Sequence, residues 1–341
     1  MTGGKREKYW KGEDSLHKRR ILQLILCGSC LMVAYMIQSK SWQSRVFVVC
    51  NTVFMILLLF ISVYPLYYAL VNSFSDGRDI TNHGYVLFWP RVFTTENWHT
   101  VLGDSSVLNA IWITASRTVI VTVLSTIITT MFAYAFSRPN LKGRKFYAGL
   151  GFVSMYISGG LIASFLFISA IGLYNNYFVY IIPSLFGGFY NVIIYSSNFK
   201  GIPPSLFESA KLDGASEFQI YGKIVMPLSK AVISALAIFT VVAIWNDYQT
   251  TLFYTDGGSL RTLQYYIVQL VHDASALEDL KTTAAAGNSE IYELLRDKAG
   301  PTSAKTIELA AMMIASIPMI VIYPFAQKYF TQGIMVGSIK G

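Results

Sequence analysis

Long apolar runs separated by short polar intervals dominate the pattern of this chain. A run of about 20 apolar residues can cross a hydrocarbon core of ~30 Å as a helix. Because the runs are continuously apolar rather than alternating, and only helices or closed barrels satisfy the backbone in lipid, they indicate helices. The pattern therefore predicts an all-α, polytopic membrane protein with six core spans. These are expected at about 46–70, 107–136, 147–170, 177–197, 230–253 and 306–326.

The composition supports this assignment. Apolar residues make up 53% of the chain and charged residues 13%, whereas roughly 25% of the residues in an average soluble domain are charged. The longest polar interval, at about 254–305, leaves no room for a second sizeable soluble domain. Within that interval, residues 288–298 (NSEIYELLRDK) predict a capped amphipathic helix.

Basic residues indicate the orientation, because short loops rich in Lys and Arg stay in the cytoplasm. If six spans alternate, the intervals after the second and fourth spans and the C-terminal tail all lie on one side. That side is expected to be cytoplasmic. The basic residues concerned are Arg138, Lys142, Arg144 and Lys145, then Lys200, Lys211, Lys223 and Lys230, then Lys328 and Lys340.

Residues 1–45 are expected to form an N-terminal extension to the membrane domain, 46–341. The segment 21–38 is just long enough to span, yet a span there would put the basic cluster at 18–20 outside, against the charge rule. Three interpretations remain: an extra span, a helix lying at the interface, or an upstream segment with Met32 or Met36 as the true start. The second and third, taken together, are favoured.

The chain lacks the motifs of several enzyme classes. No stretch matches GxxxxGK[ST], so the chain is not expected to bind or hydrolyse ATP. The histidines are scattered in polar segments, which predicts no metal site, and the three cysteines lie in apolar stretches, which does not indicate a disulfide framework. Ser158-Gly159-Gly160 resembles part of an ATPase signature, but it lies inside an apolar run, where it predicts glycine-mediated helix packing. A membrane enzyme is not expected, and neither is a nucleic-acid partner.

A charged stretch, 205–227, separates two of the most apolar segments. Ser205 followed by Glu208 is a capping-box pattern, which predicts a short helix after two prolines. Gly214 is expected to end that helix, since glycine adopts the left-handed conformation without penalty.

A second helix is predicted directly afterwards. Ser216 with Gln219 repeats the capping pattern, and Pro227 is expected to stop the helix before the fifth span. Phe218, Tyr221 and Val225 share one face at helical spacing. The two helices would form a protruding knob whose apolar residues suit a protein partner, although a solvated connecting loop is the simpler alternative.

This stretch resembles the EAA motif of permease subunits of ATP-binding-cassette importers. The motif runs roughly E-A-A, two residues, D-G-A, then I-x-x-P or I-x-L-P; Ser209 and Met226 depart from it. The resemblance covers about 46–341 and is best to the carbohydrate branch associated with complex oligosaccharides and polysaccharides. The matching motif residues are Glu208, Ser209, Ala210, Asp213, Gly214, Ala215, Ile224, Met226 and Pro227. Further similar stretches are FWPRVFTTENW (88–98), NAIWITASRTVIVTVLS (109–125), AYAFSRPNLKGR (133–144), SGGLI (158–162) and YPFAQKYFTQGIMVGSIKG (323–341).

The resemblance implies the type I importer permease fold and a multi-pass location in the cell membrane, surrounded by lipid. It implies that 205–227 is a cytoplasmic coupling segment, in which the motif residues and Phe218 face a separate ATPase. Glu208 would pair with a cation on that ATPase or cap its own helix, and Asp213 would face the ATPase or cap the second helix. The implied partners are a second homologous permease, two ATPase subunits carrying the ATP, an extracytoplasmic solute-binding protein and a carbohydrate, which in this branch is an oligosaccharide. The 288–298 helix would contact the binding protein or cover the mouth of the spans. Ala163 and Ser164 stand where the family pattern has Pro-Thr.

Charged residues inside spans are functional candidates, because leaving one in lipid costs several kcal/mol. Arg117 and Asp247 qualify, and pairing between them is the favoured interpretation. Candidate sugar contacts combine ring faces with hydrogen-bonding groups; ordinary packing and an aromatic belt are the alternative. The candidates are Tyr190, Asn191, Tyr195, Trp245, Asn246 and Asp247.

Other functions fit less of the sequence. An importer for an amino acid or phosphate would share the coupling segment. A secondary transporter or channel would work without an ATPase and predicts inverted repeats with broken helices. A membrane scaffold or sensor would explain the knob but not the polar residues in the spans.

Overall fold

A computed structural model of the chain describes residues 42–287 and 301–338. Within these residues the regular structure is helical, and one isolated bridge joins Ser75 and Phe93. The predicted all-α fold is therefore confirmed. The expected helices at 21–38 and 288–298, and the alternative starts at Met32 and Met36, lie outside the described residues.

The chain divides into two compact units, Met1–Tyr67 and Tyr68–Gly341. The packing and the candidate site below belong to the second unit. The division into an extension, 1–45, and a membrane domain, 46–341, stays a prediction.

Three of the described helices are by themselves long and apolar enough to cross a membrane. They are α2 (Trp42–Ser73), α5 (Ser105–Ser137) and α16 (Ala304–Ser338), of which the apolar part of α16 is Ala304–Pro324. They correspond to the predicted first, second and sixth spans. Helix α16 continues through Pro318 and Pro324 rather than ending at either.

The other three predicted spans are bent helix pairs, so the described residues hold up to six spans if each pair counts as one. The bends are 112° for the third span, 45° for the fourth and 82° between the charged stretch and the fifth. The apolar runs expected as spans at 147–170, 177–197 and 230–253 are each divided into separate helices. The segments are α6 (Arg144–Tyr156), α7 (Gly160–Ala170), η1 (Tyr177–Tyr180), η2 (Ile182–Ser184), α8 (Gly188–Lys200), α12 (Lys230–Asn246) and α13 (Gln249–Tyr254).

Glycine explains two of these breaks. Gly160 and Gly188 begin α7 and α8 with φ of 76° and 77°, a left-handed conformation that glycine adopts at little cost. No other atom lies within 4 Å of a Cβ built on Gly160. Ser158-Gly159-Gly160 is thus a helix break, and none of the described residues of this chain packs closely against Gly160.

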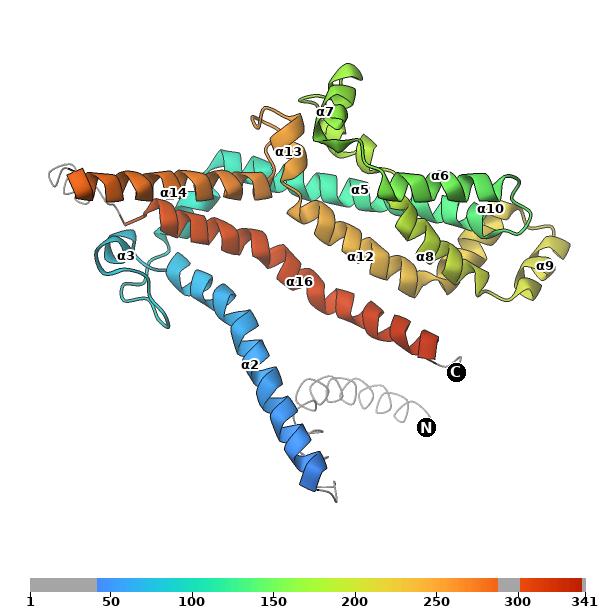
Figure 1. Ribbon diagram of the computed structural model, residues 1–341, viewed down its shortest axis with the longest axis horizontal. Coiled ribbons are helices and arrows are strands. Elements are labelled where there is room, and N and C mark those ends of the chain that lie inside the picture. Colours follow the sequence, from blue (N-terminus) through green and yellow to red (C-terminus); the bar gives the residue numbers. More distant parts are fainter. Residues whose placement is uncertain (1–41, 288–300, 339–341) are drawn as a thin grey trace, which may run out of the picture. The chain divides into compact units, whose positions relative to one another are not determined.

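Helix α5 is the central element of the second unit. It packs against α8 and α12, while α16 packs against α12 and α14 (Figure 1). One apolar core surrounds the beginning of α5 and includes Val101, Val107, Trp245, Leu263 and Ala310. A second surrounds its end and includes Ala133, Phe136, Tyr195, Phe199 and Ile220. Outside the charged stretch at 205–227, the other helices of the described residues are α3 (Gly77–His83), α4 (Glu96–Gly103) and α14 (Leu263–Gly287).

Candidate functional site

The first helix of the charged stretch, α9 (Pro204–Leu212), begins at proline. Its N-cap is Pro203, and no side chain caps it. The predicted capping box of Ser205 and Glu208 is therefore wrong. Pro204 at the first helical position has its φ already set for a helix and lacks an N–H that would need a partner, so proline alone sets the start.

The predicted glycine joint is confirmed. Gly214 has a φ of 77°, and the Ala215 N–H donates to the Ala210 carbonyl at 2.9 Å, closing the end of α9. Asp213 is the C-cap of α9, so the alternative that it caps the second helix is wrong. A Cβ built on Gly214 would meet no atom within 4 Å, so this position opens away from the chain's own packing.

The second capping box is also confirmed. Gln219 N–H donates to Ser216 Oγ at 3.3 Å, and Ser216 N–H donates to Gln219 Oε1 at 2.8 Å. Helix α10 (Glu217–Ile220) follows and continues as a π-helical turn, η3 (Tyr221–Val225), and then as α11 (Met226–Leu228).

Pro227 does not stop this helix, contrary to expectation. A proline N atom cannot donate to the carbonyl four residues earlier, and its ring crowds that carbonyl. The π turn, in which the Met226 N–H donates to the Tyr221 carbonyl, directly precedes Pro227. The direction changes at Ser229, where the helix beginning at Glu217 meets α12 at 82°.

The predicted shared face of Phe218, Tyr221 and Val225 is wrong. Val225 and Ile220 are fully buried in the core around the end of α5, whereas Phe218 is 74% exposed. Leu212, the last residue of α9, is 89% exposed. The charged stretch is thus anchored by one apolar set and presents another outward.

The predicted coupling residues divide in the same way. Ile224, Ala210 and Ala215 are half-buried against the core, while the others are exposed. The exposed residues are Glu208, Ser209, Asp213, Gly214, Phe218 and Pro227. Their roles toward a partner stay predictions.

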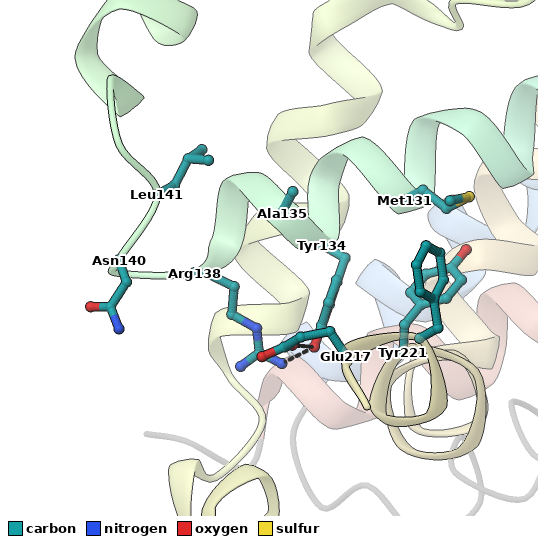
Figure 2. Close-up of a pocket in the computed structure, with 9 residues that line it drawn as sticks. Met131, Tyr134, Ala135, Arg138, Asn140, Leu141, Glu217 and Tyr221 are labelled. Atoms are coloured by element: carbon teal, nitrogen blue, oxygen red, sulfur yellow. Dashed lines mark hydrogen bonds between the residues drawn. The ribbon is translucent and has the colours of Figure 1, made fainter. Parts of the chain in front are cut away.

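Side chains also join the charged stretch to the end of α5 (Figure 2). Arg138 Nη2 donates to Tyr134 Oη at 2.5 Å, and Tyr134 O–H donates to Glu217 Oε2 at 2.5 Å. Lys211 Nζ lies 2.8 Å from Glu217 Oε1. The hydrogen bond from Lys211, followed by that from Tyr134, lowers the pKa of Glu217 below its usual range, so this carboxylate is charged at neutral pH.

Sequence reasoning missed this connection. The available signal was the spacing of four between Tyr134, in the last turn of α5, and Arg138, the C-cap of that helix, which places the two side chains together. Arg138 had been assigned only to the orientation of the chain. Nothing in the spacing indicated that Glu217, in the first turn after a cap, would reach α5.

The predicted pair of Arg117 and Asp247 is confirmed. Arg117 is 1% exposed, and its Nη1 lies 3.1 Å from Asp247 Oδ2. Its Nη2 donates to the carbonyls of Ile244, at 2.9 Å, and of Asp247. The guanidinium therefore neutralises the carboxylate and also caps the C-terminal carbonyls of α12, where a cation is favourable.

The six candidate sugar contacts do not form one cluster. Gly187, just before Tyr190 and Asn191, lies against Ser125 and Thr129 of α5. Asp247 pairs with Arg117, which is also on α5. Arg117 lies about 12–18 Å nearer the start of α5 than Ser125 and Thr129 do. The two groups are therefore held at different levels of α5.

The candidates also differ in accessibility. Trp245 is buried and its Nε1–H donates to the Ala315 carbonyl at 3.1 Å; Tyr195 is buried in the core at the end of α5. Neither ring offers a free face in this conformation. Tyr190 and Asn246 are exposed and Asn191 is half-buried, and contact of any of the six with sugar stays a prediction.

Together, the fold and the site define a class: a polytopic helical membrane protein with an exposed helix–glycine–helix segment tied to its central span. Residues 125–336 match the family described as binding-protein-dependent transport system inner membrane component. The match covers more than half of the chain, which therefore belongs to this family and is a multi-pass membrane transport component.

Relatives and a solved structure agree with that assignment. The chain is 33% identical to Protein LplC of Bacillus subtilis (strain 168), over 87% of this chain and 96% of that protein. It is 30% identical to the polygalacturonan/rhamnogalacturonan transport system permease protein YtcP of the same organism, over 84% and 96%. A bacterial ABC transporter involved in import of the acidic polysaccharide alginate has a chain that matches with a TM-score of 0.73, at 27% identity, over 86% of this chain and 99% of that one.

Proposed function

We propose that this chain is the membrane-spanning permease subunit of an ATP-driven importer for carbohydrate, with an oligosaccharide as the favoured substrate. The observation that carries the proposal is the charged stretch at the end of α5. It combines a core-anchored helix with an outward-facing glycine joint and exposed apolar residues, among them Leu212 and Phe218. Such a surface on a transport component suits a protein partner that drives transport.

The partner at this surface would be a cytoplasmic ATPase. Gly214 and the small Ala215 permit close approach of a partner backbone, and the exposed Glu208 is available for a cation on that partner. The basic residues Arg138, Lys142 and Arg144 beside the same end of α5 support a cytoplasmic location for the loop. The C-terminus would lie on the same side.

ATP would bind and react on the partner, and this chain would be non-catalytic. Its sequence contains no GxxxxGK[ST] motif to hold nucleotide phosphates. The full importer would comprise this chain, a second homologous permease, two ATPase subunits and an extracytoplasmic solute-binding protein. The binding protein would deliver sugar to the outward mouth, and ATPase closure would move the loop and alternate access.

The names of the relatives support a carbohydrate substrate. YtcP is named for polygalacturonan and rhamnogalacturonan transport, and the matched solved structure belongs to an importer of alginate. Alginate is described as an acidic polysaccharide. We therefore place oligogalacturonates, rhamnogalacturonan oligosaccharides and alginate oligosaccharides first among the substrates to test.

Purification of the intact complex tests the assembly. The chain, tagged at its C-terminus, is extracted in mild detergent, and the proteins that accompany it are identified by mass spectrometry. We expect a second permease and an ATPase. Leu212→Arg places a charge on a side chain that is 89% exposed, so it should release the ATPase while leaving the fold and the second permease in place.

Leu87→Arg is the matched control, since Leu87 is also an exposed leucine, at 56%, but lies outside the charged stretch. It should retain the ATPase. Recovery of the unmodified chain without any ATPase would refute the proposal. Once the complex is isolated, ATP hydrolysis with the solute-binding protein and each oligosaccharide in turn identifies the substrate.

A further inference from the structure

The guanidinium of Arg138 is held between two aromatic rings from different helices. Its central carbon lies 4.4 Å from the ring centroid of Tyr134, on α5, and 3.8 Å from that of Phe207, on α9. A cation within about 6 Å of a ring centroid is attracted by the ring, more strongly where water is excluded. Arg138 Nε is buried and has no hydrogen-bond partner among the described residues, so the two rings and the hydrogen bond from Nη2 to Tyr134 hold this side chain.

The same guanidinium is connected to α10. Arg138 donates to the Tyr134 hydroxyl, which donates to Glu217, and Glu217 in turn pairs with Lys211 of α9. We name these five residues, Tyr134, Arg138, Phe207, Lys211 and Glu217, the Arg138 clamp. It joins both helices of the charged stretch to the last turn of α5.

Two cavities adjoin the clamp. One, of about 440 Å³, is lined mainly by apolar residues from the end of α5 and from α10, and Figure 2 shows it with Arg138 and Glu217 among its walls. Another, also about 440 Å³, includes Phe207 and Lys211 as well as Arg138 and Glu217. The clamp therefore adds side-chain contacts to the apolar packing of Ile220 and Val225 at the end of α5 and to the hydrogen bond between Tyr221 and Thr130, at 2.8 Å.

Helix α5 extends the connection to the far side of the bundle. It is continuous from Ser105 to Ser137, and about 30 Å of helix axis separates Arg138 from Arg117. Arg117 holds the break between α12 and α13 through Asp247 and the Ile244 carbonyl. The continuous helix α5 thus contacts the charged stretch, 205–227, through Arg138 at one end. It contacts the break between α12 and α13 through Arg117 nearer the other end.

We propose that the Arg138 clamp is the positioning element through which movement of the coupling loop is passed to α5, and through α5 to the Arg117–Asp247 contact. The proposal rests on the function proposed above and adds the residues that connect the loop to the spans. A clamp that merely stabilised the loop would, when broken, lower the amount of assembled importer. A transmitting clamp would leave assembly intact and separate ATPase closure from span movement.

The test measures span movement directly and needs no sugar. In the complex purified through this chain, with Cys27, Cys30 and Cys50 replaced by serine, spin labels are placed on α5 and α16. Positions 112 and 320 suit the labels, because Trp112 and Ile320 are exposed. The distance between the labels is compared without nucleotide and with ATP plus vanadate, after reconstitution in lipid nanodiscs.

Phe207→Leu and Phe207→Tyr are the paired variants. Leucine keeps an apolar side chain but removes the ring face beneath Arg138, whereas tyrosine keeps the ring. We expect Phe207→Leu to bind the ATPase and nucleotide normally while the fraction of complexes that change distance falls about tenfold, within the usual range for coupling between sites. Phe207→Tyr should behave as the unmodified chain.

A second variant guards against misfolding. Tyr134→Phe keeps the ring and removes only the hydroxyl that joins Arg138 to Glu217, so it should assemble and show a reduced distance change. Arg144→Ala, which removes another basic residue of the same loop, is the control and should retain the full change.

Each result is decisive. A normal distance change in both Phe207→Leu and Tyr134→Phe would overturn the clamp proposal, and so would loss of the ATPase in step with loss of movement. If the unmodified complex contains an ATPase but shows no nucleotide-dependent change, transmission through α5 is refuted. Absence of an ATPase from the unmodified complex would instead refute the proposed function.

Discussion

Removal of the Asp247 charge should destabilise the span bundle, because it leaves the Arg117 guanidinium buried without a counter-charge. Taking one partner from a buried ion pair costs about 3–5 kcal/mol. Here the cost should be smaller, because the Asp247 side chain is 25% exposed and Arg117 keeps the Ile244 carbonyl as an acceptor. We expect Asp247→Asn to lower the free energy of unfolding by about 2–3 kcal/mol.

The assay is thermal unfolding of the detergent-solubilised protein, followed by the loss of its monodisperse peak in size-exclusion chromatography. With an unfolding entropy of about 2.1 cal/mol/K per residue, the expected decrease in the transition temperature of this 341-residue chain is about 3–4 °C. Asp79→Asn is the control. Its carboxylate pairs with Arg91, which is 43% exposed, and pairs with an exposed cation are worth about 0–1 kcal/mol.

A double variant separates the charge from the shape. In Arg117→Met with Asp247→Asn, no buried charge remains, and replacing a buried pair by apolar groups is often neutral. Most of the lost stability should therefore return. The reasoning is refuted if Asp247→Asn unfolds at the wild-type temperature, or if the double variant is less stable than Asp247→Asn alone.

Three further predictions concern the coupling loop and the candidate sugar contacts. Gly214→Trp should abolish uptake without affecting membrane insertion, since the site is open to a partner but a side chain is strained at a φ of 77°. Gly214→Asn should retain partial uptake. Normal uptake by the Trp variant would contradict the coupling role. Ser216→Ala should cost about 1 kcal/mol and speed amide hydrogen exchange in the first turn of α10, whereas Ser205→Ala should leave exchange unchanged, because Ser205 caps no helix. Trp245→Phe should lower the transition temperature without a selective effect on the KM for sugar, because it removes the hydrogen bond to Ala315. Tyr190→Ala, at an exposed position, should raise the KM and leave stability unchanged. The opposite pattern would make Trp245 the sugar contact and Tyr190 the packing residue.

The sequence predicted those features that depend on local chemistry. The apolar runs locate the spans because the requirement to satisfy the backbone in lipid leaves few alternatives. Gly214 and the Ser216–Gln219 box were predictable because each is decided within a few residues. The Arg117–Asp247 pair followed from elimination, since an intramembrane charge needs a partner and the spans offered few candidates.

Features that depend on tertiary packing were not predictable in the same way. Hydropathy does not register a change of direction within a run, so the breaks before Gly160 and Gly188 were missed. Trp245 and Tyr195 were selected by residue type, but burial is decided by neighbours such as Ala315 that lie far away in sequence. The Arg138 clamp likewise brings together three separate segments.

The error at Phe218 has a specific geometric cause, and it bears on function. The shared face was predicted with 3.6 residues per turn, which aligns positions three, four and seven apart. Ile220 and Val225, both fully buried, are five apart, a spacing that matches the i to i+5 repeat of a π turn. The π turn at Tyr221–Val225 therefore brings Ile220 rather than Phe218 into register with Val225. Phe218 is left 74% exposed, so the same turn that accommodates Pro227 would also supply an apolar contact for the proposed partner.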